Sequence, residues 1–161
     1  ATDIPEDKYG FAPAPGMRTV AQLLAHITQV SRFNEDVHRV RRLHTIEGYD
    51  FNALHKATAA DAQALTTKSA LLAALHAEGE KFATWLESLS DAFLAERVTN
   101  YDGKGSKSRL EMLLSPKEHE MHHRGQLMVV QRMLGIVPHL TRERDARAAQ
   151  AAAQASAAAS A

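Results

Sequence analysis

Apolar residues recur at steps of three and four along the first third of the chain, after a lead-in rich in proline. This spacing predicts one helix over residues 20–43, with its apolar side facing a core. Thr19 stands at the position of an N-cap, directly before that pattern. The apolar positions are Val20, Leu23, Leu24, Ile27, Val30, Val37 and Val40.

Two further stretches repeat the helical pattern. The first is a seam of steps of three and four that predicts packing against other helices: Leu72, Leu75, Gly79, Phe82, Leu86 and Leu89. The second spans residues 109–134, where Pro116 is expected to end a first turn or to kink the helix, and Gly135 to stop it. No stretch alternates as a strand would. The pattern therefore predicts an all-α fold, an antiparallel helical bundle.

The remaining segments carry weaker signals. Residues 1–16 hold three of the five prolines and predict an extended lead-in. Residues 44–65 are mixed, with a turn signal at Gly48, and residues 100–106 predict a loop. The chain becomes alanine-rich near its end, which favours helix but supplies no apolar stripe. We therefore predict a helical domain over residues 1–140 and a tail over 141–161, a frayed helix or disordered, without chemistry.

Composition narrows the functional classes. The 161 residues suffice for one domain, and 19 basic residues balance 19 acidic ones, so no nucleic-acid partner is expected. No cysteine is present, which excludes disulfides, thiolate metal sites and a cysteine nucleophile. No apolar run reaches the roughly 18 residues of a membrane span. We expect a cytoplasmic protein with no membrane partner.

Histidines carry the main chemical signal. His119 and His123 are four residues apart, so a helix places both imidazoles on one face, one turn apart. His26 falls on the inward side of the first predicted helix, beside Leu23 and Val30. Facing helices of a bundle build metal sites in this way. The pattern therefore predicts a divalent metal site formed by His26, His119 and His123.

The other histidines are weaker candidates. His122 lies to one side of the pair and is expected to flank the site. We expect no metal role for five histidines without a visible partner: His38, His44, His55, His76 and His139. The stretch from His119 to His123 also matches H-E-x-x-H, the zinc-protease pattern, with Glu120 as base and Glu143 as a possible third ligand. Such helices usually lie beside a sheet, and none is predicted, so this interpretation is a remote alternative.

Two blocks of sequence resemble the DinB-like (damage-inducible, YfiT-type) proteins. One runs through PEDKY, PAPGMRT and QLLAHI of residues 5–27, and the other is EHEMHHRGQL of residues 118–127, followed by LGIVP. The resemblance implies a four-helix bundle with the family's first helix missing or replaced. It also implies a divalent ion, variously zinc, nickel, iron or manganese, held by His26, His119 and His123.

The resemblance points less firmly to a reaction. Some members of the family are thiol S-transferases that use bacillithiol or mycothiol, and one branch is a mycothiol-dependent isomerase. We therefore expect a metal-dependent enzyme for a small molecule, a thiol S-transferase or a hydrolase, with a role in stress response. A non-catalytic metal-binding or helical interaction protein is the alternative. Because three amphipathic helices leave a side open, we expect a homodimer, unless residues 44–65 fold over as a fourth helix.

Overall fold

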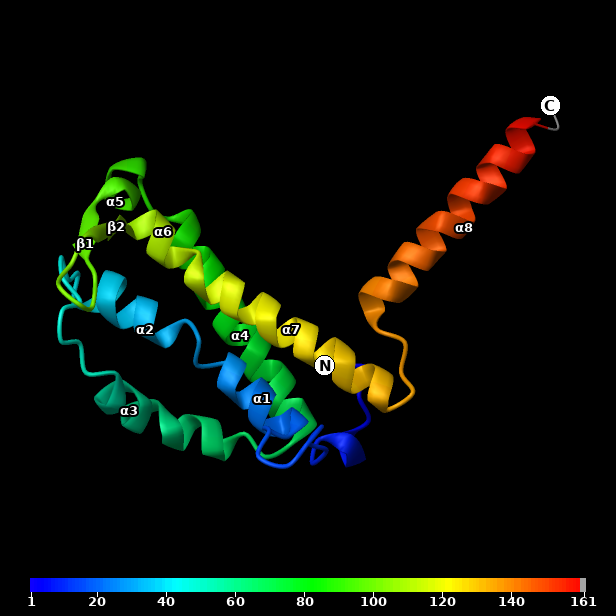
Figure 1. The fold of residues 1–161 in the computed structure, drawn as a ribbon, viewed down its shortest axis with the longest axis horizontal. Helices are drawn as coiled ribbons and strands as arrows, with labels where there is room; N and C mark the ends of the chain where they lie inside the picture. The colour runs from blue at the N-terminus through cyan, green and yellow to red at the C-terminus, as the bar shows by residue number, and fades with distance from the viewer. Residues whose placement is uncertain (160–161) are drawn as a thin grey trace.

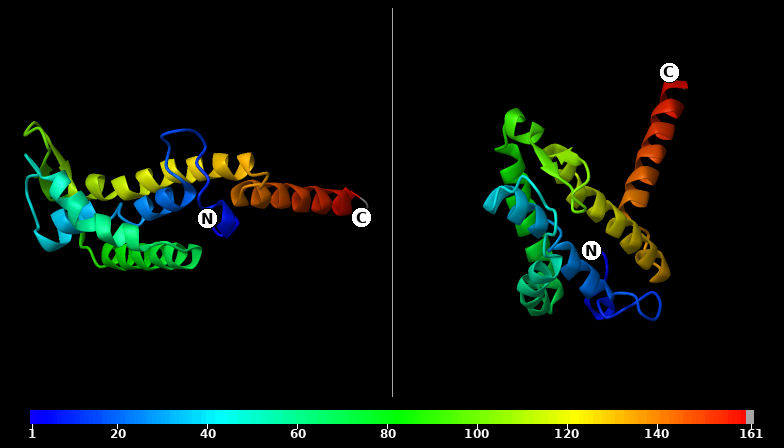
Figure 2. Two further views of the ribbon diagram at one scale, coloured as in Figure 1. Left: turned by 90° about the horizontal axis from the view of Figure 1, so that it is seen from below. Right: turned by 60° about the vertical axis from the view of Figure 1, so that its left-hand side comes forward.

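The computed structural model describes residues 1–159 and is mainly helical (Figures 1 and 2). Two short strands form one antiparallel hairpin, and the long helices α4 and α7 run along the body of the molecule. The elements follow in the order α1 (Val20–Ile27), α2 (Arg32–Asn34), a π-helix (Glu35–Val40), α3 (Phe51–Ala64), α4 (Lys68–Glu87), α5 (Asp91–Ala95), β1 (Arg97–Thr99), β2 (Ser106–Ser108), α6 (Arg109–Leu113), α7 (Ser115–Met133) and α8 (His139–Ala159), after a 3₁₀ turn (Glu6–Lys8). The predicted all-α class is confirmed.

The first predicted helix begins where expected but is not continuous. Thr19 caps α1 through a capping box with Gln22, whose side chain in turn accepts from the Thr19 backbone. The prediction of one helix over 20–43 is wrong, because α1 ends at Ile27 and the chain resumes as α2 at Arg32. The Thr28 hydroxyl donates to the Ala25 carbonyl at 2.7 Å, a local bond that competes with helical pairing.

The helix predicted over 109–134 is divided as well. Ser108 caps α6 with a capping box, and α7 starts at Ser115 after a break at Leu114. Pro116 lies in the first turn of α7, where its missing N–H costs no helical bond. Gly135 stops α7 as expected: it adopts φ 75°, and the Ile136 N–H donates to the Gln131 carbonyl at 2.8 Å.

The hairpin was not predicted. Arg97 pairs with Ser108, Val98 with Lys107 and Thr99 with Ser106, so each strand is three residues long. Strands this short show too little alternation to be recognised from sequence. The loop between them matches the predicted turn, with Gly103 and Gly105 both at positive φ.

The main core lies where α1, α4 and α7 pack together with the lead-in. Its buried members are Ile4, Tyr9, Val20, Leu23, Leu24, Ala25, Leu71, Leu127 and Val130. The lead-in is held by the Lys68 ammonium group, which donates to the carbonyls of Thr2 and Ile4. This core fixes α1 against α7, and therefore fixes the histidines that face each other across that contact.

Two segments outside the three predicted long helices, residues 44–65 and 139–159, also contain helices. The first contains α3, which runs beside α1 and α2 and buries none of its own residues. The second is α8, a helix that projects away from the body in all three views. The tail is therefore helical through Ala159, while residues 160–161 of the predicted tail lie outside the described residues. No helix in residues 1–159 is long and apolar enough to cross a membrane.

A buried polar cluster lies beside a second apolar core near the hairpin. Arg109 is fully buried, and its guanidinium donates to Glu96 at 2.8 Å and lies 2.9 Å from His38 Nδ1. The same guanidinium stacks over the Phe93 ring at 4.8 Å. His38 is therefore structural, as expected. Burial, with a smaller contribution from the adjacent Arg109 charge, lowers the pKa of His38 to about 4.

The His38 environment predicts a loss of stability in mild acid. An unfolded His38 takes up a proton near its ordinary pKa of 6.5, whereas the folded protein resists until about 4. Stability that is present above pH 6.5 is therefore lost as the pH falls through this window, by about 3 kcal/mol from this residue. Urea unfolding of wild type and His38→Gln should show a shallower pH dependence for the variant. Equal pH dependence of the two proteins would contradict the assignment.

Candidate metal centre

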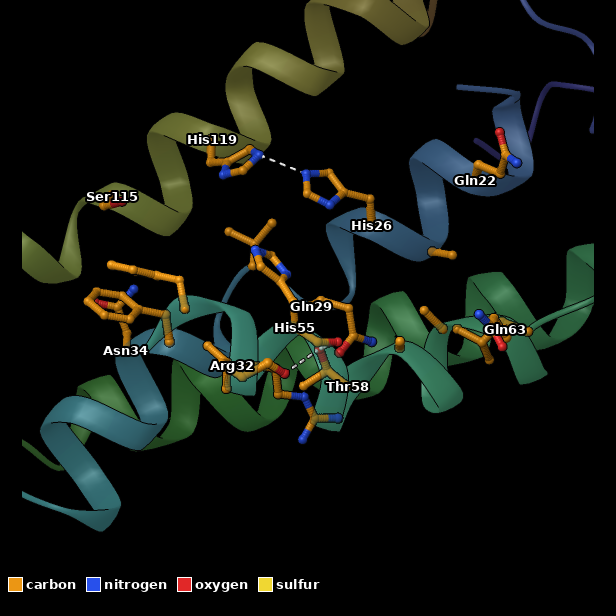
Figure 3. Close-up of a pocket in the computed structure, with 18 of the residues that line it drawn as sticks. Gln22, His26, Gln29, Arg32, Asn34, His55, Thr58, Gln63, Ser115 and His119 are labelled. Carbon is orange, nitrogen blue, oxygen red and sulfur yellow. Dashed lines mark hydrogen bonds between the residues drawn. The ribbon is translucent and has the colours of Figure 1, made fainter. Parts of the chain in front are cut away.

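Three histidines from α1 and α7 meet between these helices. His26 Nε2 lies 3.1 Å from His119 Nε2, which lies 2.7 Å from His123 Nε2. His123 is buried, and the other two are half-buried. Figure 3 shows the His26 and His119 rings pointing at each other from their two helices. Three imidazole nitrogens thus converge on one point, which is the arrangement a single divalent ion requires.

The hydrogen bonds behind the cluster select the tautomer of His123. The Gln126 amide nitrogen donates to His122 Nε2 at 3.0 Å, so its oxygen faces His123 Nδ1 at 2.8 Å. That oxygen can only accept, and His123 Nδ1 therefore carries the proton. The Nε2 lone pair of His123 is left free and faces the other two rings. Bound metals are usually supported by partners of this kind.

The surroundings disfavour protonation of two of the three imidazoles. Burial lowers the pKa of His26 to about 4, with smaller contributions from Arg18, His123 and His119. Burial also lowers the pKa of His119, followed by the effects of His123 and His122. Both imidazoles are therefore unprotonated at neutral pH, as metal ligands must be.

A cavity of about 650 Å³ opens beside the histidines, between α1, α2 and α3. Its wall includes His26 and His119, and Figure 3 shows polar side chains distributed around it. His55 rises from α3 into the space below His26 and His119. The sequence singled out no role for His55, because α3 has a weak apolar pattern and its position could not be inferred.

The carboxylates of the zinc-protease pattern lie elsewhere. Glu120 and Arg124 line a separate groove between α4 and α7, on a different side of α7 from the cavity. Glu143 lies on α8 and pairs with His139 at 2.9 Å. The third histidine of the cluster comes from α1, so the geometry favours His26 as a ligand over Glu143, and leaves Glu120 without access to the cluster.

The remaining histidines show no comparable grouping. His122 flanks the cluster through Gln126, in agreement with its expected supporting position. His44 is exposed on the loop before α3, and His76 is exposed on α4, 3.9 Å from Glu80. Among residues 1–159, the His26–His119–His123 group is the one set of three suitable side chains whose ligand atoms gather within 4.8 Å of one another.

Fold and site together define an all-helical protein with a three-histidine cluster suited to a divalent ion. The DinB superfamily matches residues 1–127, which include both histidine-bearing segments, and the chain belongs to this superfamily. Comparisons with curated proteins and with solved structures give no match. Family membership and the presence of the three-histidine cluster are therefore established, but these comparisons identify neither a metal nor a reaction.

Gln126 should influence metal affinity without touching the metal. Replacing it by leucine removes the acceptor of the His123 Nδ1 proton, and affinity should fall roughly 10–100-fold. Gln126→Glu keeps an acceptor oxygen and should retain most of the affinity. Competition with a chromophoric chelator measures both variants, and unchanged affinity in Gln126→Leu would show that this hydrogen bond does not support the site.

Proposed function

We propose that His26, His119 and His123 bind one divalent ion, and that the protein is a metal-dependent enzyme acting on a small molecule. One observation carries the proposal: three Nε2 atoms converge, and two of the residues that supply them, His26 and His119, line a cavity of about 650 Å³. Catalytic sites combine such three-ligand sets with an open position. A cluster facing a cavity of ligand size is better suited to catalysis than to a structural metal.

The donor set fits the metals expected from sequence. Imidazole nitrogen suits zinc, nickel and iron, and manganese would bind more weakly. Three neutral ligands leave the full charge of the ion in place. A bound ion would supply Lewis acidity, lowering the pKa of a coordinated water or thiol.

We favour thiol transfer over hydrolysis for a chemical reason. No carboxylate of residues 1–159 lines the cavity, so water would lack the usual carboxylate base. A thiol is far more acidic than water and needs less help. Because the chain has no cysteine, the thiol must be a cosubstrate. Its sulfur would bond to an electrophilic carbon, the bond from that carbon to the leaving group would break, and the thiol proton would pass to the leaving group, with His55 placed to carry it.

A thiol-transfer assay tests this proposal. Chlorodinitrobenzene releases chloride when a thiolate attacks, and it can be offered with cysteine or glutathione to metal-loaded, metal-stripped and His119→Ala protein. We expect turnover only with the loaded wild type. His55→Gln should lower the rate without lowering metal content. Equal rates in loaded and stripped protein would overturn the proposal, and metal-dependent ester hydrolysis without thiol turnover would favour a hydrolase.

We also propose that a second copy of the chain covers the groove between α4 and α7. This groove, of about 910 Å³, is lined by apolar side chains that include Leu75, Phe82 and Leu86 of α4 and Leu127 and Met128 of α7. No described residue of α3 lines this groove. If residues 44–65 serve as the fourth helix of the bundle, the groove between α4 and α7 therefore still stays open. A formal net charge of zero does not oppose self-association.

Sedimentation tests this assembly. At micromolar concentration we expect a mass near twice 17.6 kDa. Phe82→Arg places a charge in the groove and should give a monomer, whereas Glu80→Arg, on the exposed side of α4, should remain dimeric. A wild-type monomer that unfolds cooperatively would contradict the prediction.

A further inference from the structure

The wall of the cavity beside the histidines holds a buried hydrogen-bond acceptor that has no donor among residues 1–159. The Thr28 hydroxyl gives its proton to the Ala25 carbonyl, so toward Gln29 it can act only as an acceptor. The Gln29 amide nitrogen donates to that hydroxyl at 2.9 Å. These two bonds fix the orientation of the amide. Its oxygen is left buried, and no described residue donates to it. Gln29 lines the cavity, and a buried acceptor favours a donor there.

A buried donor lies three residues further along the chain, in the same wall. Arg32 also lines the cavity, and its Nε is buried without an acceptor in residues 1–159. A hydroxyl or an amide of a ligand both donates and accepts, so it could satisfy Gln29 and Arg32 together. An ether or a hydrocarbon could not donate to Gln29.

The charges of the cavity wall argue for a neutral ligand. Arg32 is the one Lys, Arg, Asp or Glu side chain among the described residues that line it. Its guanidinium is already neutralised by Glu78 at 3.1 Å and lies 3.9 Å from Asp61. An anionic ligand would therefore lose its hydration without gaining an unpaired cation.

By exposed area the wall is mostly apolar, although polar residues also line it. The apolar residues are Val30, Phe33, Phe51, Leu54, Leu65 and the alanines 21, 25, 59 and 62. The two phenylalanine rings stack with centroids 5.2 Å apart. The volume of about 650 Å³ lies within the range of small-molecule sites. Such a wall suits a ring system or a hydrocarbon body.

From these observations we propose that the cavity binds a neutral, largely apolar molecule whose hydroxyl or amide group is held by Gln29. Gln29 follows His26 by three residues, so the polar group of the ligand would be anchored close to the cluster. The inference deepens the proposed function by naming the class of acceptor substrate, and Gln29 is then a positioning and specificity residue. Binding itself requires no metal.

A matched set of probes tests the proposal by calorimetry on full-length protein, both metal-loaded and metal-stripped. The probes are β-naphthol, its methyl ether and naphthoate. Stripped wild type should bind β-naphthol about tenfold more tightly than the ether, the effect of one hydrogen bond to a buried acceptor, and should bind naphthoate most weakly. The same ranking of β-naphthol over the ether is expected in loaded protein.

Two variants locate the effect. Gln29→Met keeps the length of the side chain and removes the acceptor, so the preference for β-naphthol should disappear while affinity for the ether stays the same. Gln63→Met, on the exposed part of the same cavity wall, should keep the preference. In stripped wild type, equal binding of β-naphthol and ether, tightest binding of naphthoate, or no binding at all would each overturn the proposal. Because the test does not require metal, it can succeed or fail independently of the proposed catalysis.

Discussion

Protein carrying His123→Ala is expected to lose its metal. His123 is the buried member of the cluster, and its Nε2 is oriented by the bond from Nδ1 to Gln126. Removing one of three ligands should reduce the metal affinity by more than the roughly 10–100-fold expected when a residue that only hydrogen-bonds to a ligand is replaced. After dialysis against a mild chelator, metal content should fall from about one ion per chain to nearly none. His26→Ala and His119→Ala should behave alike.

His122→Ala is the matched control for this experiment. This variant also removes an imidazole from the same turn of α7. The His122 ring nitrogen contacts the Gln126 amide instead of the point at which the Nε2 atoms of the three candidate ligands converge. Most of the metal should remain. Full retention by His123→Ala would refute the assignment of ligands, and a loss in His122→Ala as large as in the other three would show that the pairing of His119 with His123 is wrong.

Arg109→Leu is expected to give the largest loss of stability. The fully buried guanidinium contacts Glu96, His38 and the Phe93 ring, and leucine replaces none of these polar contacts. Removing one partner of such a cluster should cost about 3 kcal/mol or more of unfolding free energy. Arg109→Lys should also destabilise, because one ammonium group cannot reproduce the planar fork. Urea unfolding at neutral pH measures both.

A surface arginine provides the comparison. Arg144 lies on α8 with its side chain 73% exposed and pairs with Asp145 at 2.9 Å. Exposed pairs contribute little, so Arg144→Leu should unfold with the wild-type midpoint within error. If Arg109→Leu and Arg144→Leu were equally stable, the buried cluster would not hold α6 to the rest of the fold.

Periodicity identified the parts of this fold that rest on strong local signals. The Thr19 cap, the end of α7 at Gly135 and the inward faces of α1 and α7 all follow from residue type and spacing. Because those faces carry His26, His119 and His123, the sequence was sufficient to nominate the cluster. The break after Ile27 was not predictable, because the Thr28 hydroxyl makes a local hydrogen bond that competes with an otherwise helical pattern. The division near Leu114 lies where Pro116 was expected to end a first turn.

The cavity could not be predicted from the spacing of apolar residues along the chain. α3 buries no residue of its own, so its pattern gave no inward face and no reason to place His55. The unused Gln29 acceptor becomes visible only when the Thr28 hydroxyl is seen to donate to Ala25. Arg109 and His38 lie 71 residues apart, and nothing local relates one to the other. Sequence therefore identified candidate ligands, while the possible substrate pocket required tertiary structure.

The most direct test of the three-histidine metal site is an anomalous-scattering map from crystals of untagged protein, recorded at the absorption edge that elemental analysis indicates. We expect one peak per chain, bonded to Nε2 of His26, His119 and His123. A map without a peak at this point, from protein grown and purified with the candidate metals present, would contradict this expectation. So would a peak bonded to Glu120 or Glu143.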